Sequence, residues 1–127
     1  MGKLIVIEGT DGSGKSTQFR LLKQRMEQDQ VDFRTLIFPR YSEESSALIR
    51  MYLNGEFGDK PSDVNAYAAS AFYAVDRFAS YKQEWGCWYE QGGLILSDRY
   101  TTSNAVHQAS KEPEENRSAF LKWLYEF

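Results

Sequence analysis

The segment GTDGSGKST at residues 9–17 constrains this chain more than any other part of it. The segment satisfies the pattern G-x-x-x-x-G-K-[ST] at every fixed position. It follows the β-branched run KLIVIE at residues 3–8, which predicts a strand buried on both faces. It precedes residues 15–29, where apolar side chains recur at helical spacing. A glycine-rich turn between a strand and a helix is typical of a phosphate-binding loop, so we expect the chain to bind a nucleoside triphosphate.

The chemistry of such a loop follows from its residue types. Glycines let backbone N–H groups converge on phosphate oxygens, and the following helix adds its dipole and its unpaired N–H groups. We expect Lys15 to reach the β- and γ-phosphates and the Ser16 hydroxyl to bind Mg²⁺. The predicted nucleotide-binding residues are Gly9, Thr10, Gly12, Ser13, Gly14, Lys15, Ser16 and Thr17. Kinases, GTPase switches and motor ATPases share this motif, so it does not identify the phosphate acceptor.

The first 38 residues predict an α/β fold. Residues 31–38 form a second strand pattern that Pro39 ends, so strand, helix and strand follow one another. Two strands connected through a helix indicate a mainly parallel sheet.

Further elements follow in the rest of the chain. We expect a short helix at residues 43–53 and a long helical stretch at residues 62–91, capped by Ser62 or Asp63 and kinked or divided at Gly86. A third buried strand is predicted at residues 94–97, and helices at residues 101–109 and 115–127.

The number of strands bears on domain organisation. Only three strands are readable, whereas a doubly wound sheet usually has five or more. We therefore expect residues 1–127 to be the N-terminal part of a single larger domain, truncated to its first three strands.

Composition excludes several classes of protein. A net charge of −3 and a pI near 5.2 argue against broad nucleic-acid binding, which needs a basic face. The sequence holds one cysteine, Cys87, and so no intrachain disulfide. There is no run of membrane-spanning length and no signal-peptide pattern at the N-terminus, so we expect a cytoplasmic protein without a membrane partner.

Charged side chains follow the predicted strands at their carboxyl ends. Arg40 lies in FPRY at residues 38–41, after the second strand, and Asp98 and Arg99 follow the third. In open α/β sheets, ligands bind beyond these strand ends. Two arginines near a phosphate-binding loop favour phosphate-binding roles over the alternative of solvated surface side chains.

The ordered set of segments resembles the thymidylate kinase family, which transfers the γ-phosphate of ATP to dTMP. The set consists of the loop with Asp11, FPRY, YAVDR at residues 73–77, and DRY at residues 98–100 followed by Ser103, Asn104 and Gln108. The resemblance runs from residue 3 to about residue 109. It implies a P-loop kinase-type parallel sheet with flanking helices, ATP and Mg²⁺ as cofactors, and a homodimer of the full-length protein.

The resemblance also implies catalytic roles. Lys15 would stabilise charge on the transferring phosphoryl group, and Asp11 would approach the acceptor's 3′-hydroxyl and the metal-bound water. Arg40 and Arg99 match the arginines that hold the acceptor phosphate in line. Asp98 occupies the strand-end position near Mg²⁺, so the implied metal ligands are Ser16 and Asp98.

Base recognition would fall to the helices. Tyr73 matches a position where the family places an aromatic ring against thymine, with a core role as the alternative, and Arg77 matches an arginine that donates to a thymine carbonyl. Asn104 and Gln108 either pair with the base edge or are ordinary surface amides. The implied dTMP-binding set is Asp11, Phe38, Arg40, Tyr41, Tyr73, Arg77, Arg99, Asn104 and Gln108.

One position departs from part of the family. Position 12 is glycine, where some members carry an arginine, and members without it supply one from a lid in the second half of the fold. The lid and the adenine-binding segment lie beyond the region of resemblance, so we expect little or no turnover from residues 1–127 alone. Two alternatives stay open: a deoxynucleoside kinase, which would place a carboxylate at the end of the second strand, and a non-catalytic nucleotide-binding fragment.

Overall fold

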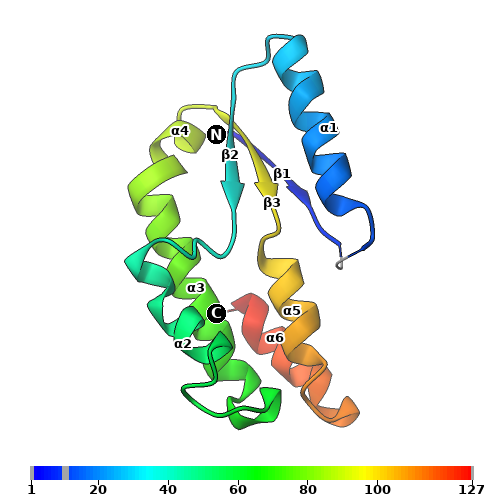
Figure 1. Cartoon of the computed structure of the whole chain (residues 1–127), viewed down its shortest axis with the longest axis vertical. Helices are drawn as coiled ribbons and strands as arrows, with labels where there is room; N and C mark the ends of the chain where they lie inside the picture. The colour runs from blue at the N-terminus through cyan, green and yellow to red at the C-terminus, as the bar shows by residue number, and fades with distance from the viewer. Residues whose placement is uncertain (1, 10–11, 127) are drawn as a thin grey trace. The chain divides into compact units, whose positions relative to one another are not determined.

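A computed structural model describes residues 2–9 and 12–126 (Figure 1). The strands are β1 (Lys3–Ile7), β2 (Phe33–Ile37) and β3 (Leu94–Asp98). The helices are α1 (Lys15–Gln28), α2 (Ala47–Leu53), α3 (Ala66–Ser80), α4 (Gly86–Glu90), α5 (Thr101–Ala109) and α6 (Arg117–Glu126). The predicted α/β pattern is confirmed.

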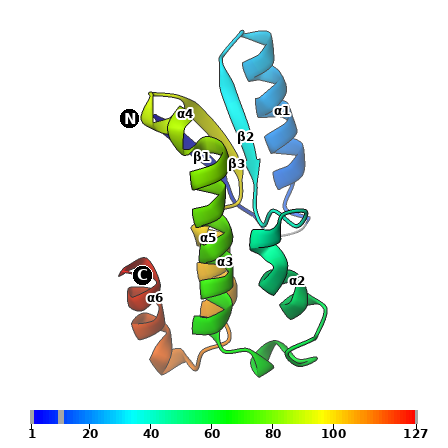
Figure 2. The ribbon, with the colours of Figure 1, turned by 90° about the vertical axis from the view of Figure 1, so that its left-hand side faces the viewer.

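The strands form one parallel sheet in the order β1-β3-β2. Ile7 of β1 and Ile37 of β2 are both in register with Asp98 of β3, so the carboxyl ends of the strands are aligned. Helix α1 returns alongside the strands after the turn at residues 12–14 (Figures 1 and 2). This is the parallel sheet that the strand–helix–strand pattern predicts.

Burial differs among the strands, and here one prediction is wrong. The central strand β3 is buried as expected, with Ile95 and Leu96 fully buried. Strand β1 is not buried on both faces, because Lys3 is exposed and Ile5 is 40% exposed while Leu4 between them is half-buried. Side chains alternate between the faces of a strand, so the described residues cover only one face of β1 at these positions.

The chain divides into two compact units, each with its own core. The sheet unit comprises the described residues up to Phe38 together with Ser80–Tyr100, and the helical unit comprises Pro39–Ala79 together with the described residues from Thr101 onward. The core of the sheet unit consists of Leu36, Phe38, Trp85 and Ile95, with partly buried aromatic rings around them.

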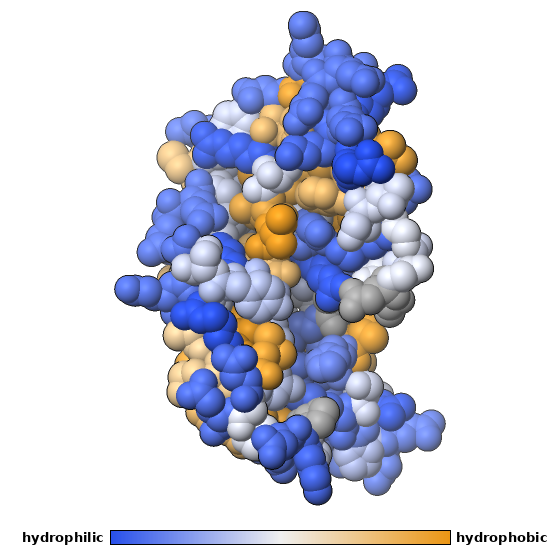
Figure 3. Space-filling view, viewed as in Figure 1, coloured by the Kyte–Doolittle hydropathy of each residue, from blue (hydrophilic) through white to orange (hydrophobic). Residues whose placement is uncertain are grey.

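The core of the helical unit is built on small residues around one ring. It consists of Ala66, Ala105, Ala109, Phe120 and Leu124. Figure 2 shows α3 between α2 and α6. Hydrophobic side chains also reach the surface, where Figure 3 shows orange patches among blue ones; Val75 and Phe78 of α3 are 52% and 64% exposed.

The long helical stretch predicted at residues 62–91 is interrupted. Pro61–Asp63 form a separate 3₁₀ turn, and α3 begins only at Ala66. The predicted cap at Ser62 or Asp63 is therefore wrong. Asn65 caps α3, because its Oδ1 accepts the backbone N–H of Ala68 at 2.9 Å, three residues on.

A π-helical turn at Tyr81–Trp85 separates α3 from α4. A π-helical turn holds one more residue than an α-helical turn. Here it brings Gly86, the residue after the turn, close to Tyr81 at its start. At Gly86 the backbone is ordinary α-helix, with φ −60° and ψ −44°, so the position does not require glycine for its conformation. The expected division of the stretch at Gly86 agrees with the structure.

We predict that Gly86→Ala destabilises the protein. A Cβ at position 86 would lie 2.6 Å from the carbonyl oxygen of Tyr81 and 2.9 Å from its ring. The gain of about 1 kcal/mol in helix propensity is smaller than the cost of overpacking, about 1–3 kcal/mol. Urea unfolding should show a lower midpoint for the variant; a raised midpoint would mean that the crowding is relieved at no cost.

Candidate functional site

The predicted phosphate loop joins β1 to α1 through glycines in unusual conformations. Gly12 and Gly14 have φ values of 81° and 88°, in the left-handed region that glycine adopts without strain. At Gly9, a Cβ would lie 2.6 Å from the Ser13 hydroxyl and 3.2 Å from the Lys15 Cβ, so a larger residue would force these side chains to move. Thr10 and Asp11, predicted to bind nucleotide and acceptor, lie outside the described residues.

Lys15, at the start of α1, contacts the end of β3. Its Nζ donates to Oδ1 of Asp98 in a short, charge-assisted contact. The side chains are 9% and 19% exposed, so the pair is largely shielded from solvent. The structure thus brings together two residues that are 83 positions apart and were both predicted for the phosphate and metal site.

Arg99 follows Asp98 in a conformation that is rare for its residue type. Its φ is 70°, a left-handed value that only a few per cent of non-glycine residues adopt. Its N–H donates to the Ile7 carbonyl at 3.1 Å, and its carbonyl accepts the Ser97 hydroxyl at 2.7 Å. Backbone held in a sparsely populated region suggests a functional position, which supports the prediction for Arg99.

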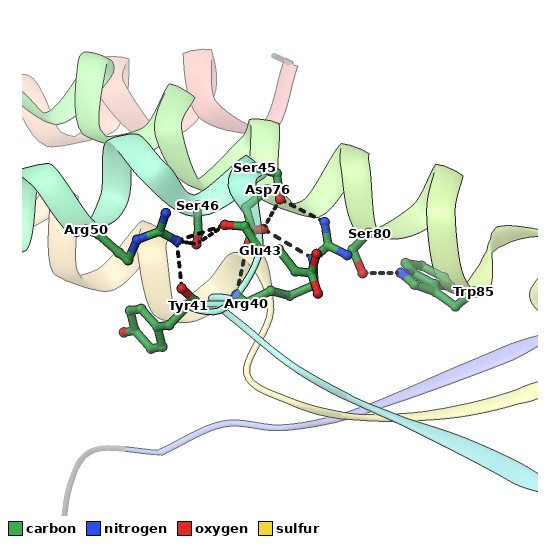
Figure 4. Close-up of polar contacts among 9 residues, drawn as sticks. All are labelled: Arg40, Tyr41, Glu43, Ser45, Ser46, Arg50, Asp76, Ser80 and Trp85. Atoms are coloured by element: carbon green, nitrogen blue, oxygen red, sulfur yellow. Dashed lines mark hydrogen bonds and ion pairs between the residues drawn. The ribbon is translucent and has the colours of Figure 1, made fainter.

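In the helical unit, Arg40 is held by Asp76 of α3 (Figure 4). The Asp76 carboxylate accepts the backbone N–H of Arg40 at 2.8 Å and its Nε–H at 3.3 Å. Both side chains are buried, at 7% exposure for Arg40 and 1% for Asp76. Ser45 bridges the pair, since its hydroxyl accepts from Arg40 Nη2 and donates to Asp76 Oδ1.

The loop that carries Arg40 is fixed by a second arginine, Arg50 of α2 (Figure 4). Its Nη1 donates to the carbonyl oxygens of Tyr41 and Glu43 at 2.6 and 2.8 Å, and also to the Ser46 hydroxyl at 2.5 Å. Carbonyl groups that point out of a turn are thereby satisfied by one guanidinium. The side chain of Tyr41, predicted to contact the acceptor, is 53% exposed.

Two amides of α5 are buried with unsatisfied polar atoms. Gln108 is fully buried, and neither its Oε1 nor its Nε2 has a hydrogen-bond partner among the described residues. Asn104 is 7% exposed; its Nδ2 donates to the Ser70 hydroxyl at 3.1 Å, while its Oδ1 has no partner in the same part of the chain. Both side chains are far more buried than the surface-amide alternative requires. Unpaired buried polar atoms are costly, so they suggest a ligand that supplies partners.

The remaining predicted acceptor residues differ in their surroundings. Tyr73 of α3 is half-buried, and burial, together with the neighbouring Tyr41 and Tyr52, raises its pKa to about 12. Its phenol therefore stays protonated at physiological pH. Arg77 is half-buried on the same helix, and Phe38 is packed in the core of the sheet unit, 5.5 Å from Tyr100 between ring centroids.

Possible metal ligands are few. No group of three or more His, Cys, Asp or Glu side chains suited to a metal ion occurs within residues 2–9 and 12–126. Ser16 and Asp98, a hydroxyl and a carboxylate, are the hard oxygen donors that Mg²⁺ binds together with water and phosphate. Two protein donors are too few to hold a metal ion without other ligands. Ser16 and Asp98 therefore fit a magnesium ion that is also bound by the phosphates of a nucleotide.

Comparison with known proteins decides the family. The family model for thymidylate kinase matches residues 7–123. The chain belongs to the thymidylate kinase family. At its C-terminal end the match extends beyond the region of resemblance, which reaches about residue 109, and includes most of α6.

Individual members of the thymidylate kinase family are similar over nearly the whole chain. The thymidylate kinase of Mycobacterium tuberculosis is 35% identical over 122 residues, which cover 95% of this chain and 56% of that protein. A probable thymidylate kinase of Methanobrevibacter smithii is 33% identical, with 93% and 58% covered. The structure of Candida albicans thymidylate kinase matches with a TM-score of 0.73 at 27% identity, covering 98% of this chain and 56% of that one. The chain thus spans about half the length of the thymidylate kinases it matches.

None of the helices in the described part of the chain is both long enough and apolar enough to cross a membrane.

Sequence reasoning missed the residues that hold the predicted ones in place. Asp76, Ser45 and Ser70 had no predicted role, yet they bind Arg40 or Asn104. A signal did exist for Asp76, because it is the first charged residue after an uncharged stretch at residues 64–75. A lone carboxylate in such a helix is seldom buried without a cationic partner. Nothing in the sequence distinguishes Ser45 from Ser42 or Ser46.

Proposed function

We propose that the protein to which this sequence belongs transfers the γ-phosphate of ATP to dTMP, giving dTDP. One observation in the structure carries the choice of acceptor: Gln108 is fully buried with both amide atoms unpartnered among the described residues. Such a side chain is suited to a ligand that offers an acceptor and a donor next to each other. Membership of the thymidylate kinase family supports the phosphoryl transfer itself.

The residues of the sheet unit would act on the triphosphate. Lys15 and the loop amides would neutralise charge on the transferring group, and Arg99 would contact the acceptor phosphate. Ser16 and Asp98 would hold Mg²⁺, which supplies charge neutralisation between the phosphates when bound. Since phosphoryl transfer needs little covalent help from the protein, positioning and charge account for the catalysis.

The helical unit would recognise the base. The edge of thymine presents an N–H donor between two carbonyl acceptors. Asn104 Nδ2 donates to Ser70, and its Oδ1 has no partner among the described residues, so Oδ1 would be the acceptor for that N–H. Gln108 Nε2 would donate to a carbonyl, Tyr73 would stack on the ring, and Arg77 would donate to a carbonyl as the family resemblance implies.

We also propose the setting in which this protein acts. ATP and Mg²⁺ are its cofactors, and the cytoplasm is its location, in line with the lone cysteine. We propose a homodimer for the full-length protein, supported by Val75 and Phe78, which leave a hydrophobic strip of α3 exposed.

A deoxynucleoside kinase is the competing assignment, and it needs a carboxylate base for a 5′-hydroxyl. Asp76 is a carboxylate that contacts the segment after β2, where it binds Arg40. It is 1% exposed and accepts three hydrogen bonds, so it is poorly suited to remove a proton from a substrate.

A panel of acceptors tests the assignment. Calorimetric titration of the chain with dTMP, dUMP, AMP and thymidine should show a preference for dTMP, and coupled assays should show little turnover without the other half of the family fold. A preference for thymidine would favour the deoxynucleoside kinase. The absence of binding to dTMP would overturn the proposal, and normal kinase rates would refute the prediction of low turnover.

Gln108→Leu should separate the role of this amide in binding from its effect on folding. Leucine fits a similar volume without polar atoms, so the variant should be more stable by about 1–3 kcal/mol because an unsatisfied amide is removed. Its affinity for dTMP should fall at least tenfold. Urea unfolding and calorimetry measure the two effects, with Gln24→Leu on the exposed face of α1 as the matched control. A stability below that of the wild type would show that the amide is satisfied in the free protein.

A further inference from the structure

We propose that Asp76 and Ser45 are positioning residues that fix Arg40 for the phosphate of the acceptor, so that the protein prefers a nucleoside monophosphate to the free nucleoside. The inference rests on the proposed function and adds to it the residues that set this preference. Neither residue bears a predicted role from sequence, and both lie in the helical unit with Arg40.

The contacts form a closed ring of hydrogen bonds (Figure 4). Arg40 Nη2 donates to Ser45 Oγ at 2.8 Å, and the Ser45 hydroxyl donates to Asp76 Oδ1 at 2.7 Å. Arg40 Nε–H closes the ring on the same Oδ1 at 3.3 Å. The other carboxylate oxygen, Oδ2, accepts the backbone N–H of Arg40 at 2.8 Å. Side chain and backbone of Arg40 are therefore held by one carboxylate.

The burial of this pair favours a positioning role over a stabilising one. A buried ion pair often adds no net stability, because the cost of removing two charges from water offsets their attraction. What the ring does achieve is to restrict the torsions of a long side chain. A guanidinium already ordered in the free protein loses less conformational entropy on binding an anion.

The position of Asp76 on α3 connects this ring to the proposed base contacts. Asp76 directly precedes Arg77 and lies one helical turn after Tyr73, both proposed to contact the base. The loop that carries Arg40 is thus attached to the same turns of α3 that carry the base-contacting residues. Arg50 fixes the rest of that loop through the carbonyl oxygens of Tyr41 and Glu43. A phosphate and a base at a fixed separation require such a connection.

The test compares affinities for dTMP and thymidine, which differ only in the phosphate. Ser45→Ala removes one hydroxyl from the ring, and Asp76→Glu keeps the charge but lengthens the side chain by a methylene group. The controls are Ser42→Ala in the same loop and Asp32→Glu, both at exposed positions. Calorimetry of the whole chain gives the ratio of the two dissociation constants for each variant.

We expect the preference for dTMP over thymidine to fall about fivefold in Ser45→Ala, the loss of roughly one net hydrogen bond. It should fall at least tenfold in Asp76→Glu, while the affinity for thymidine changes less than twofold in both variants. The controls should keep the wild-type ratio. In ¹⁵N-labelled protein, the Nε–H signal of Arg40 should shift on adding dTMP but not on adding thymidine.

Each outcome distinguishes the two levels of the proposal. If the wild-type chain binds neither compound, the proposed function fails and the inference fails with it. If the wild type prefers dTMP and Ser45→Ala keeps the full preference, only the positioning role is overturned. A fall in affinity for dTMP and thymidine by the same factor assigns Asp76 and Ser45 to folding alone and overturns the inference as well.

Discussion

Lys15→Met is expected to lower the affinity for MgATP about 100-fold, because charge-assisted hydrogen bonds contribute about 1.5–3 kcal/mol each and 1.4 kcal/mol corresponds to a factor of ten. Methionine retains much of the apolar stem of the lysine and removes only the ammonium group. Calorimetry with MgATP and with magnesium tripolyphosphate measures the loss, and tripolyphosphate isolates the contribution of the phosphates from that of adenosine.

The same substitution leaves the Asp98 carboxylate without its cation, since Lys15 Nζ donates to it in the free protein. A drop in stability is therefore part of the expected result and has to be separated from the binding effect. Lys15→Met combined with Asp98→Asn removes both charges, and Lys23→Met on the exposed face of α1 is the matched control. An affinity for tripolyphosphate unchanged by Lys15→Met would exclude the proposed role of Lys15.

Phe120→Ala is expected to destabilise the protein by about 3–5 kcal/mol, the range for removing a buried aromatic side chain. Phe120 is fully buried at the centre of the helical core, and Tyr67 packs against its ring edge-on with the centroids 5.1 Å apart. The small neighbours Ala66 and Ala105 cannot fill the cavity. Urea unfolding should show a large fall in the transition midpoint.

Phe78→Ala provides the control for the same chemical change at an exposed position. The ring of Phe78 is 64% exposed on α3, so its truncation should change stability by less than about 0.5 kcal/mol. A concentration series accounts for any self-association through this residue. Equal losses of stability in the two variants would contradict the assignment of Phe120 to the core.

Local sequence signals predicted the elements of the fold well. The β-branched runs, the glycine-rich loop and Pro39 locate the strands and α1 to within a few residues, because these residues restrict the backbone directly. The predicted start of α3 was wrong. Ser62, Asp63 and Asn65 are all residue types that cap helices well, and the actual cap is the one whose side chain reaches a free backbone N–H group. The exposure of β1 depends on what covers its face, which residues 3–8 do not encode.

The candidate site was predictable only where residues close in sequence act together. The loop at residues 9–17 and the pair Asp98 and Arg99 could be found from spacing and strand ends. The partners of Arg40 could not, because Asp76 is 36 positions away and only the packing of the helical unit brings them together. The burial of Gln108 is likewise a tertiary property, since its neighbours on α5 include the exposed Val106.

The contact between Lys15 and Asp98 has a consequence for which anions the loop retains. In the free protein the lysine is already neutralised, so a chloride or sulfate ion must separate an existing ion pair and leave a carboxylate without a counter-charge. For a nucleotide that brings a divalent ion, the proposed roles imply a different balance: Lys15 would contact the phosphate instead of the carboxylate, and Asp98 would be available to hold the metal. On the proposed function, this ion pair would make the loop favour metal-complexed polyphosphates over the simple salts in the surrounding solution.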